Sequence, residues 1–438
     1  MSQILKRGQT VRTKSSSLSC EVEQFLGGGG QGEVYKATWA DKLVALKWYF
    51  PQAATPEQKA SIERLVKMGP PNERFLWPIE LVSSPQVLGF GYLMPLREPR
   101  YKSLVDLMKR RIEPSFRALA TAGLKLADSF LALHSRGLCY RDISFGNVFF
   151  DPDSGSVLIC DNDNVTVDGA GKGGVLGTPR FMAPEIVREE AAPSTQTDLF
   201  SLAVLLFYLF IVHHPLEGKK EASIRCLDLP AMTKLYGTEP IFIFDPHNRC
   251  NEPIRGYHDN ALDFWPLYPS FLKDLFTRAF TEGLRDPLNG RVRESEWRAA
   301  MIRLRDAICY CPHCGSENFY DEATAAAGSE PSCWQCKQAL RLPLRLCLGK
   351  AQVMLNHDTR LYPHHTDANK PYDFSHPSAQ VSQHPANPGV WGLKNLTQEN
   401  WSIKGTDGLV KDVPPGRSVS LMPGLTIHFG TLEGTIER

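Results

Sequence analysis

The sequence predicts a multidomain chain with an α+β fold over residues 20–308, a small cysteine-bound ribbon over 309–340 and a β-sandwich over 341–438. Three observations lead to this prediction. A glycine-rich turn between strand-like segments is followed by helical periodicity, then by two Cys-x-x-Cys pairs, and finally by short apolar segments that alternate with turn residues. At 438 residues the chain also exceeds one ordinary domain, so roughly two to three cores are expected.

Composition narrows the possible partners and locations. Lys plus Arg number 49 and Asp plus Glu number 48, so the net charge of +1 predicts neither a nucleic-acid nor a membrane-surface partner. The most apolar run, 199–212, is shorter than the roughly 20 residues that cross a bilayer, which favours a buried core helix. Residues 1–19 mix basic residues with serines and contain no apolar signal core, so we expect a disordered tail and a cytoplasmic protein.

The first element is a hairpin with a glycine-rich turn. Its G-x-G-x-x-G-x-V pattern consists of Gly27, Gly29, Gly32 and Val34. Apolar segments at 22–26 and 34–39 flank the turn and predict two strands. Because no Cβ is in the way, backbone N–H groups in such a turn can approach phosphate oxygens, whereas a flexible hairpin turn is the plainer alternative.

A second strand, at 43–49, carries Lys47 at the end of the sequence Val-Ala-Leu-Lys. This segment resembles the V-A-I-K element of protein kinases, in which the lysine contacts the α- and β-phosphates and a helix glutamate. The resemblance implies nucleotide contacts for Ala45 and Lys47.

The helix that would supply this glutamate is expected over residues 56–68, after an N-cap at Thr55. We choose Glu63 over Glu57 as the partner of Lys47, because apolar residues surround Glu63 in the sequence. A position on the surface is the alternative for either glutamate.

Another strand and a long helix follow. The segment 90–96, Phe-Gly-Tyr-Leu-Met-Pro-Leu, resembles the kinase strand that enters the hinge. This resemblance implies that backbone groups around Met94 bond the adenine edge. Apolar residues then recur at helical spacing over 115–134, and this helix leads directly into the loop at 140–147.

Residues 140–147, Tyr-Arg-Asp-Ile-Ser-Phe-Gly-Asn, place Asp142 and Asn147 five positions apart. Such a carboxylate can accept a proton from an attacking hydroxyl while the amide oxygen binds magnesium, as in the H-R-D-L-x-x-x-N loop of protein kinases. By this resemblance Asp142 is the catalytic base, Asn147 a metal ligand and Arg141 a supporting residue. The family's usual lysine two residues after the aspartate is replaced by Ser144, as it is in atypical kinases of the RIO type. Losing this charge-assisted contact should slow transfer on the order of a hundredfold if nothing compensates.

A hairpin over 148–160 is expected to bring Asp161 beside Asn147. By resemblance Asp161 takes the place of the metal-binding aspartate in the kinase Asp-Phe-Gly motif, but the next two residues are Asn162 and Asp163. We interpret Asp163 as a turn-forming residue in preference to an anion that lies next to the metal ligands or a further metal ligand.

Residues 177–185, Gly-Thr-Pro-Arg-Phe-Met-Ala-Pro-Glu, are the most specific string in the chain. They resemble the G-T-P-x-Y-M-A-P-E segment that ends the activation loop of protein kinases. The resemblance implies that Thr178 contacts the substrate segment and that Glu185 forms a buried ion pair with Arg291. It also implies that Asp198, at the start of the apolar helix, holds the backbone of the catalytic loop.

Together these motifs resemble a eukaryotic-type Ser/Thr protein kinase domain. The resemblance implies a bilobal α+β fold with an N-lobe over 20–95 and a C-lobe over 96–308. It also implies ATP with Mg²⁺ or Mn²⁺ as cofactors and a protein hydroxyl as the substrate.

Four cysteines form two Cys-x-x-Cys pairs that are separated by 18 residues. They are Cys311, Cys314, Cys333 and Cys336. This spacing suits four thiolates around a tetrahedral Zn²⁺, and because no position remains for water we predict a structural site. A redox dithiol is the alternative.

The last segment, 341–438, contains short apolar stretches with turns about every 8 to 12 residues, which is typical of a β-sandwich. Its end, 413–430, resembles the last strands of a forkhead-associated (FHA) domain. The phosphothreonine contacts of that family have no clear counterpart here, so a partner-binding sandwich and a phosphopeptide reader both stay open.

The arrangement as a whole resembles bacterial kinases of tellurite-resistance-type gene clusters. The resemblance implies a von Willebrand A-domain protein and a metal-dependent protein phosphatase as partners. We therefore predict a Ser/Thr kinase whose ribbon and FHA-like modules recruit partners. The alternatives are a nucleotide-binding pseudokinase scaffold and a phosphopeptide-binding adaptor.

Overall fold

The computed structural model describes residues 3–169, 176–326, 328 and 330–438. The chain divides into two compact units, of which the first comprises Met1–Trp265 and Asp274–Arg298 and the second Pro266–Lys273 and Ala299–Arg438. Residues 266–273 and 299–308, which the sequence analysis assigned to the α+β region, therefore group with the ribbon and the β-sandwich. Each unit is described by itself below.

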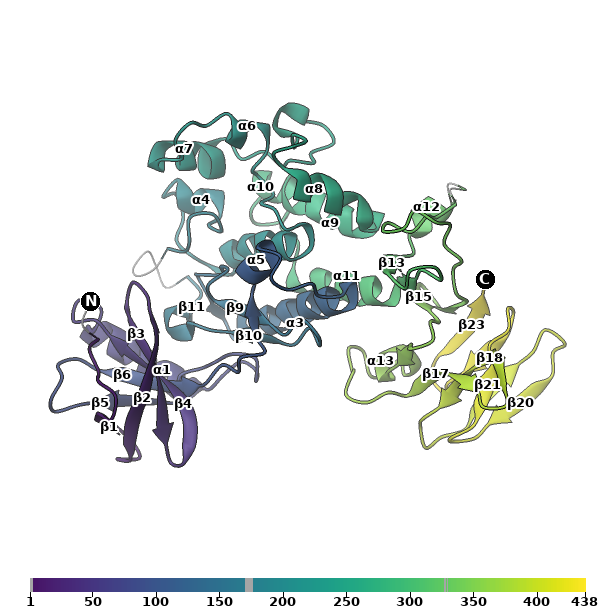
Figure 1. Ribbon diagram of the computed structural model, residues 1–438, viewed down its shortest axis with the longest axis horizontal. Coiled ribbons are helices and arrows are strands. Elements are labelled where there is room, and N and C mark those ends of the chain that lie inside the picture. The colour runs from purple at the N-terminus through teal and green to yellow at the C-terminus, as the bar shows by residue number, and fades with distance from the viewer. Residues whose placement is uncertain (1–2, 170–175, 327, 329) are drawn as a thin grey trace. The chain divides into compact units, whose positions relative to one another are not determined.

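The N-terminal lobe of the first unit is a closed barrel of antiparallel strands in the order β1-β2-β3-β4-β6-β5. Its strands are β1 (Thr10–Thr13), β2 (Ser19–Gly28), β3 (Gly32–Trp39), β4 (Lys42–Tyr49), β5 (Glu80–Ser83) and β6 (Gly91–Pro95). Helix α1 (Pro56–Met68) lies beside the barrel (Figure 1) and buries Ile62 and Leu65. The hydroxyl of Thr55 caps this helix by accepting the N–H of Gln58.

The expectation of a disordered tail over residues 1–19 is wrong for the described residues 3–19. Strand β1 pairs with β2 through Val11 and with β5 through Thr13, so it closes the barrel. Leu5 and Val11 are fully buried, and the N–H of Leu5 donates to the hydroxyl of Tyr35 at 2.9 Å. Burying these two apolar side chains stabilises an ordered conformation that the basic and serine-rich composition did not indicate.

The second lobe of this unit is mainly helical. Its helices are α2 (Leu104–Met108), α3 (Phe116–His134), α4 (Pro184–Val187), α5 (Thr195–Ile211), α6 (Lys219–Ala222), α7 (Leu229–Thr233), α8 (Asp259–Phe264) and α10 (Glu282–Arg285). Two further helices, α9 (Ser270–Ala279) and α11 (Glu294–Asp306), have residues in both units. Figure 1 shows α3 and α5 at the centre of the lobe, and α5 is buried on every side from Thr197 to Ile211. An apolar helix that is buried all round is a core helix. In the part of the chain that the structure describes, every helix is too short or too polar to cross a membrane.

Two small sheets frame the loop at 140–147. Strand β8 (Leu138–Cys139) precedes the loop and pairs with β11 (Thr166–Val167). Strand β9 (Val148–Phe150) follows the loop and lies between β10 (Val157–Ile159) and β7 (Lys102–Ser103). The expected hairpin is therefore present as β9 and β10. Asn147 directly precedes it and Asp161 closely follows it.

The second unit contains a small ribbon and two larger sheets. The ribbon pairs β12 (Ile308–Tyr310) with β13 (Glu317–Phe319), and α12 (Glu322–Ala326) follows. One sheet has the order β15-β14-β23-β22-β19-β20, with β14 (Arg345–Leu348), β15 (Ala351–Met354), β19 (Trp401–Lys404), β20 (Val410–Val413), β22 (Thr426–His428) and β23 (Glu433–Glu437). The other has the order β16-β17-β18-β21, with β16 (Arg360–Leu361), β17 (Ala379–His384), β18 (Asn387–Asn395) and β21 (Ser418–Ser420), and the short helix α13 (Pro363–Thr366) follows β16.

The two larger sheets share one apolar core. Leu346 and Ile427 of the first sheet and Val381 and Leu393 of the second belong to the same buried cluster. This C-terminal region is therefore rich in β-structure, as predicted. Tyr268 contacts Phe319 with 5.4 Å between the ring centroids, which explains why residues 266–273 group with the ribbon.

Candidate active site

The glycine-rich turn lies between β2 and β3. Gly27 pairs with Val34 across the two strands, and the N–H of Gly29 donates to the carbonyl of Gly32 at 2.9 Å. A Cβ on Gly32 would lie 2.2 Å from the carbonyl oxygen of Trp48, so only glycine lets β3 approach β4 here. Among the described residues, none except the immediate chain neighbours comes within 4 Å of a Cβ built on Gly27 or Gly29, so there is space beside the backbone of the turn.

Three neighbouring strands carry the other predicted nucleotide contacts. Val34 on β3 pairs with Lys47 on β4, and Ala45 on β4 pairs with Met94 on β6. The structure therefore brings Val34, Ala45, Lys47 and Met94 together on adjacent strands, next to the end of the barrel where the glycine-rich turn lies.

Lys47 is held by two carboxylates of the segment after β10. Its Nζ lies 2.5 Å from Oδ1 of Asp161 and 2.8 Å from Oδ2 of Asp163, and the lysine is only 4 % exposed. Burial by itself would lower the pKa of Lys47, but the negative charges of Asp163 and Asp161 outweigh burial and raise that pKa. The ammonium is therefore charged when it faces the site.

Asp163 is the residue whose importance the sequence analysis missed. Its side chain is completely buried, and besides Lys47 it accepts a hydrogen bond of 2.5 Å from the hydroxyl of Tyr49. A short 3₁₀ turn at Asn162–Asn164 places it there, so the predicted turn is real but the carboxylate also has a specific cationic partner. Its position two residues after Asp161 placed Asp163 near the candidate site, but its burial and its partner are visible only in the structure.

The predicted pair of Lys47 with Glu63 is not formed, and this choice of partner is corrected. Glu63 bonds the ammonium of Lys14 at 2.6 Å, and a third of its side chain is exposed. The residue of α1 that reaches the site is Gln58, whose side-chain amide donates to the Tyr49 hydroxyl at 3.1 Å and to the Asp163 carbonyl at 3.3 Å. Helix α1 is therefore oriented so that a neutral side chain, and not a carboxylate, faces the site.

The backbone at the start of the 140–147 loop is held by Asp198. This carboxylate, 1 % exposed at the start of α5, accepts the N–H of Tyr140 at 2.5 Å and the N–H of Arg141 at 2.9 Å. Arg141 has a φ of 77°, a left-handed conformation that costs a non-glycine residue about 1–3 kcal/mol. The two charge-assisted hydrogen bonds offset that strain and fix the direction of the chain just before Asp142.

Asp142 is fixed by two hydrogen bonds. The hydroxyl of Thr178 donates to its Oδ1 at 2.7 Å, and the amide of Asn147 donates to its Oδ2 at 3.0 Å. The same amide also donates to the Asp142 carbonyl at 2.7 Å. These contacts orient a carboxylate that can accept a proton from a nearby hydroxyl.

Ser144 occupies the position of the family's usual lysine and is buried. Among the described residues, no Lys or Arg forms an ion pair with Asp142.

Oxygen donors suited to a hard cation lie beside Lys47. The N–H of Cys160 donates to the carbonyl of Asn147 at 2.8 Å, which ties Asp161 to Asn147. Since the Asn147 nitrogen is engaged with Asp142, its side-chain oxygen remains available for a cation. Burial and the charge of Asp163 raise the pKa of Asp161 in spite of Lys47, so a bound cation would stabilise its ionised form. These donors fit Mg²⁺ or Mn²⁺.

Glu185 and Arg291 support the site from the helical lobe. One Nη of Arg291 lies 2.7 and 2.8 Å from the two carboxylate oxygens of Glu185, and the other Nη donates to the carbonyl of Gln196 at 2.6 Å. The arginine is 5 % exposed. The pair anchors α4, which begins within the 177–185 segment, to the start of α5.

Four cysteine sulfurs of the second unit form a group that could hold a metal ion. The sulfurs of Cys311, Cys314, Cys333 and Cys336 all lie within 4.8 Å of one another. The Cys311–Cys336 and Cys314–Cys333 distances are 3.6 Å, close to the roughly 3.8 Å between thiolates that bind one Zn²⁺ tetrahedrally. The side-chain amide of Asn318 donates to the Cys333 sulfur at 3.6 Å, a contact that favours a thiolate. The four residues therefore fit zinc.

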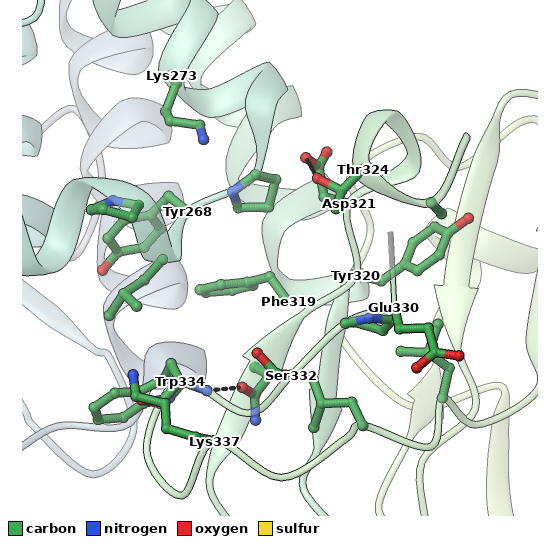
Figure 2. Close-up of a pocket in the computed structure, with 18 residues that line it drawn as sticks. Tyr268, Lys273, Phe319, Tyr320, Asp321, Thr324, Glu330, Ser332, Trp334 and Lys337 are labelled. Atoms are coloured by element: carbon green, nitrogen blue, oxygen red, sulfur yellow. Dashed lines mark hydrogen bonds between the residues drawn. The ribbon is translucent and has the colours of Figure 1, made fainter. Parts of the chain in front are cut away.

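A cavity of about 390 Å³ also lies in the second unit (Figure 2). Tyr268, Phe319 and Trp334 contribute aromatic rings to its lining, and a hydrogen bond of 3.1 Å from the Trp334 N–H to Asn318 crosses one side. None of the nucleotide or catalytic residues predicted from the sequence lines it. The residues that the sequence predicted for phosphoryl transfer all belong to the first unit, so the candidate active site lies there.

Comparison with known proteins shows which family this chain matches. Residues 20–266 match the model of the protein kinase domain. The chain is similar to a cell cycle serine/threonine-protein kinase of Saccharomyces cerevisiae, with 30 % identity over 28 % of this chain and 18 % of the relative. It is also similar to a serine/threonine-protein kinase of Caenorhabditis elegans (30 % identity, 27 % of this chain, 19 % of the relative) and to a CBL-interacting protein kinase of Oryza sativa subsp. japonica (26 % identity, 47 % of each). The chain thus spans less than half the length of each of these relatives.

Proposed function

The chain belongs to the protein kinase family, and from this premise we propose that it transfers the γ-phosphoryl group of ATP to serine or threonine hydroxyls of a protein. The observation that carries the proposal is the arrangement of Asp142, which is oriented by Thr178 and Asn147 within a loop that Asp198 holds. The similarity to serine/threonine kinases over part of the chain supports the same choice of hydroxyl.

The proposed mechanism divides the binding of phosphate, base, hydroxyl and cation among these residues. The backbone of the glycine-rich turn and the ammonium of Lys47 bind phosphate oxygens, and the strands around Ala45 and Met94 bind the base. Asp142 orients the substrate hydroxyl and accepts its proton. Asn147 and Asp161 would hold Mg²⁺ or Mn²⁺, which supplies positive charge to the phosphates when bound.

The main alternative is a pseudokinase that binds nucleotide as a scaffold, and Ser144 is the reason to test it. We expect transfer from labelled ATP to the chain itself or to a protein substrate, at a rate on the order of a hundredfold below that of a kinase with the usual lysine. Asp142→Asn should reduce this transfer by at least about a hundredfold, because the variant has lost its proton acceptor.

Asp153→Asn is the matched control, since Asp153 is an exposed carboxylate on the turn between β9 and β10. It should transfer phosphate at the wild-type rate. Equal labelling of wild type and Asp142→Asn would contradict the kinase proposal and favour the scaffold.

We further propose that the four-cysteine group binds one structural Zn²⁺ and that the C-terminal β-structure recruits partners. The resemblance to bacterial tellurite-resistance-cluster kinases supports a von Willebrand A-domain protein and a metal-dependent phosphatase as those partners, and a cytoplasmic location. A co-purification experiment with candidates of these two classes tests this, and failure of both to bind the full chain would contradict it.

The FHA-like resemblance also supports a phosphopeptide-binding role for this region. Asn395 is a faint echo of the asparagine contact of that family. Its side-chain amide, however, donates both hydrogens to the carbonyls of Glu399 and Val413, which is a structural use of that side chain. A peptide array that shows equal binding of phosphorylated and plain peptides would exclude the phosphopeptide role.

A further inference from the structure

We propose that Asp163, in place of a carboxylate on helix α1, positions the ammonium of Lys47 for the phosphates of the nucleotide. This inference rests on the proposed function in one respect only: the ligand that binds beside the glycine-rich turn and Lys47 is taken to be a nucleotide. It makes Asp163 a positioning residue, because it acts through Lys47.

The first step is the geometry of the pair. Oδ2 of Asp163 lies 2.8 Å from Nζ of Lys47, and the two side chains are 0 % and 6 % exposed. An ion pair that excludes water is screened much less than a surface pair, and it holds the ammonium in one place. The hydroxyl of Tyr49 donates to the same oxygen at 2.5 Å and so fixes the carboxylate in turn.

The second step compares Asp163 with the other carboxylate at Lys47. Asp161 lies 2.5 Å from the ammonium, but 38 % of its side chain is exposed and it is also the expected cation ligand. A cation that binds Asp161 would compete with Lys47 for its oxygens. Asp163 faces no solvent, so it keeps its contact with Lys47 in either case.

The third step concerns the two glutamates of α1 that were candidates for this role. Glu63 is paired with Lys14, and Glu57 is exposed in the first turn of the helix. The helix reaches the site through Gln58, with neutral hydrogen bonds to Tyr49 and to the Asp163 carbonyl. Moving α1 would thus break two neutral hydrogen bonds and leave the ion pair of Lys47 intact.

The fourth step asks whether packing alone explains a carboxylate here. Within the described part of the chain, Oδ1 of Asp163 is buried and has no hydrogen-bond partner. A buried acceptor without a donor destabilises the fold, and so does the burial of charge. The charge of Asp163 is therefore explained by the cation that it holds, and not by the packing around it.

The test measures binding of a fluorescent ATP analogue to the full chain, in EDTA and again with Mg²⁺. We expect Asp163→Asn, which keeps the shape of the side chain, to raise the Kd by about tenfold with Mg²⁺, because the cation engages Asp161 and Lys47 loses its remaining charged partner. In EDTA the increase should be smaller, since Asp161 still pairs with Lys47. Asp153→Asn, the exposed matched control, should bind like the wild type. Tyr49→Phe should raise the Kd in the same direction by a smaller factor, and it serves as the second variant if Asp163→Asn does not fold.

A rescue variant separates positioning from a structural effect. Gln58→Glu combined with Asp163→Asn places a new carboxylate beside the Tyr49 hydroxyl, so the double variant should recover part of the lost affinity. A wild-type Kd for Asp163→Asn and Tyr49→Phe, or loss of affinity in Glu63→Gln instead, would overturn the proposal.

The same samples distinguish this proposal from the proposed kinase function. Weak nucleotide binding by Asp163→Asn supports the positioning role even if the wild type transfers no phosphate. Normal nucleotide binding and transfer by Asp163→Asn, together with an inactive Asp142→Asn, would overturn the positioning role and leave the kinase function standing.

Discussion

At the scale of single residues, His134 of α3 contacts both Asp198, which holds the 140–147 loop, and Glu294 of α11. Its ring lies at the end of α3, 3.1 Å from the Asp198 carboxylate and in hydrogen-bond contact with Glu294 of α11. Burial by itself would lower the pKa of His134, but the hydrogen bonds to Asp198 and Glu294 raise it to about 9. His134 is therefore charged at neutral pH and balances the negative charge of the residue that holds the loop.

This pKa predicts a fall in stability on the alkaline side. Because the pKa is higher in the folded chain than in the unfolded one, where it is about 6.5, the stabilisation is complete below pH 6.5 and is lost as the pH rises to about 9. The free energy of unfolding of the first unit should decrease by about 3 kcal/mol over this range. Denaturant titrations at several pH values measure it.

His134→Gln provides the comparison for this pH dependence. The variant keeps a hydrogen-bonding side chain but cannot titrate, so its stability should be lower at pH 6.5 and should change less between pH 6.5 and 9. Parallel curves for the wild type and the variant would show that other groups cause the change.

The residues of the site differ in how far the sequence alone could predict them. Asp142 and Asn147 lie on one short loop, so their spacing almost determines their proximity. Glu63 was chosen from its apolar neighbours in the sequence, but which face of α1 meets the barrel depends on tertiary packing, and Gln58 occupies that place. Asp163 was assigned to a turn correctly, yet turn propensity carries no information on a lysine 116 positions earlier.

At the scale of elements, long periodic segments were predictable and short ones were not. The apolar run at 199–212 predicted a buried helix, and α5 (Thr195–Ile211) is such a helix. The prediction of a protein kinase domain is confirmed by the family match over 20–266. Strand β1 was missed because its four residues carry only two buried side chains, and its stability depends on pairing with β2 and β5.

At the same scale, we expect the ribbon to depend on the proposed zinc for its stability. The two strands of the ribbon, β12 and β13, have only three residues each, which is too few for independent stability. Metal analysis should find about one zinc per chain, and Cys311→Ser should lose the zinc and unfold the ribbon. Cys250→Ser, which changes an exposed cysteine of the first unit, should keep both zinc and fold. Zero zinc in the wild type would contradict the site.

At the scale of the whole molecule, two separate apolar cores support the division into two units. Leu46 and Trp48 belong to a buried cluster of the barrel, whereas Leu346 and Trp401 belong to that of the C-terminal sheets. The residues proposed to bind nucleotide all lie in the first unit, and the four cysteines all lie in the second. A ligand of one unit should therefore stabilise that unit selectively.

Calorimetry of the full chain should show two unfolding transitions with different ligand responses. Mg²⁺ and ATP at about a hundred times the Kd should stabilise the first unit by about 2.7 kcal/mol and raise only its Tm. A zinc chelator should lower only the Tm of the second unit, because metal binding contributes to its folding. Lys47→Ala is the control, since it should abolish the shift caused by nucleotide while leaving the response to the chelator unchanged. A single transition that responds to both ligands would show that the two units unfold together.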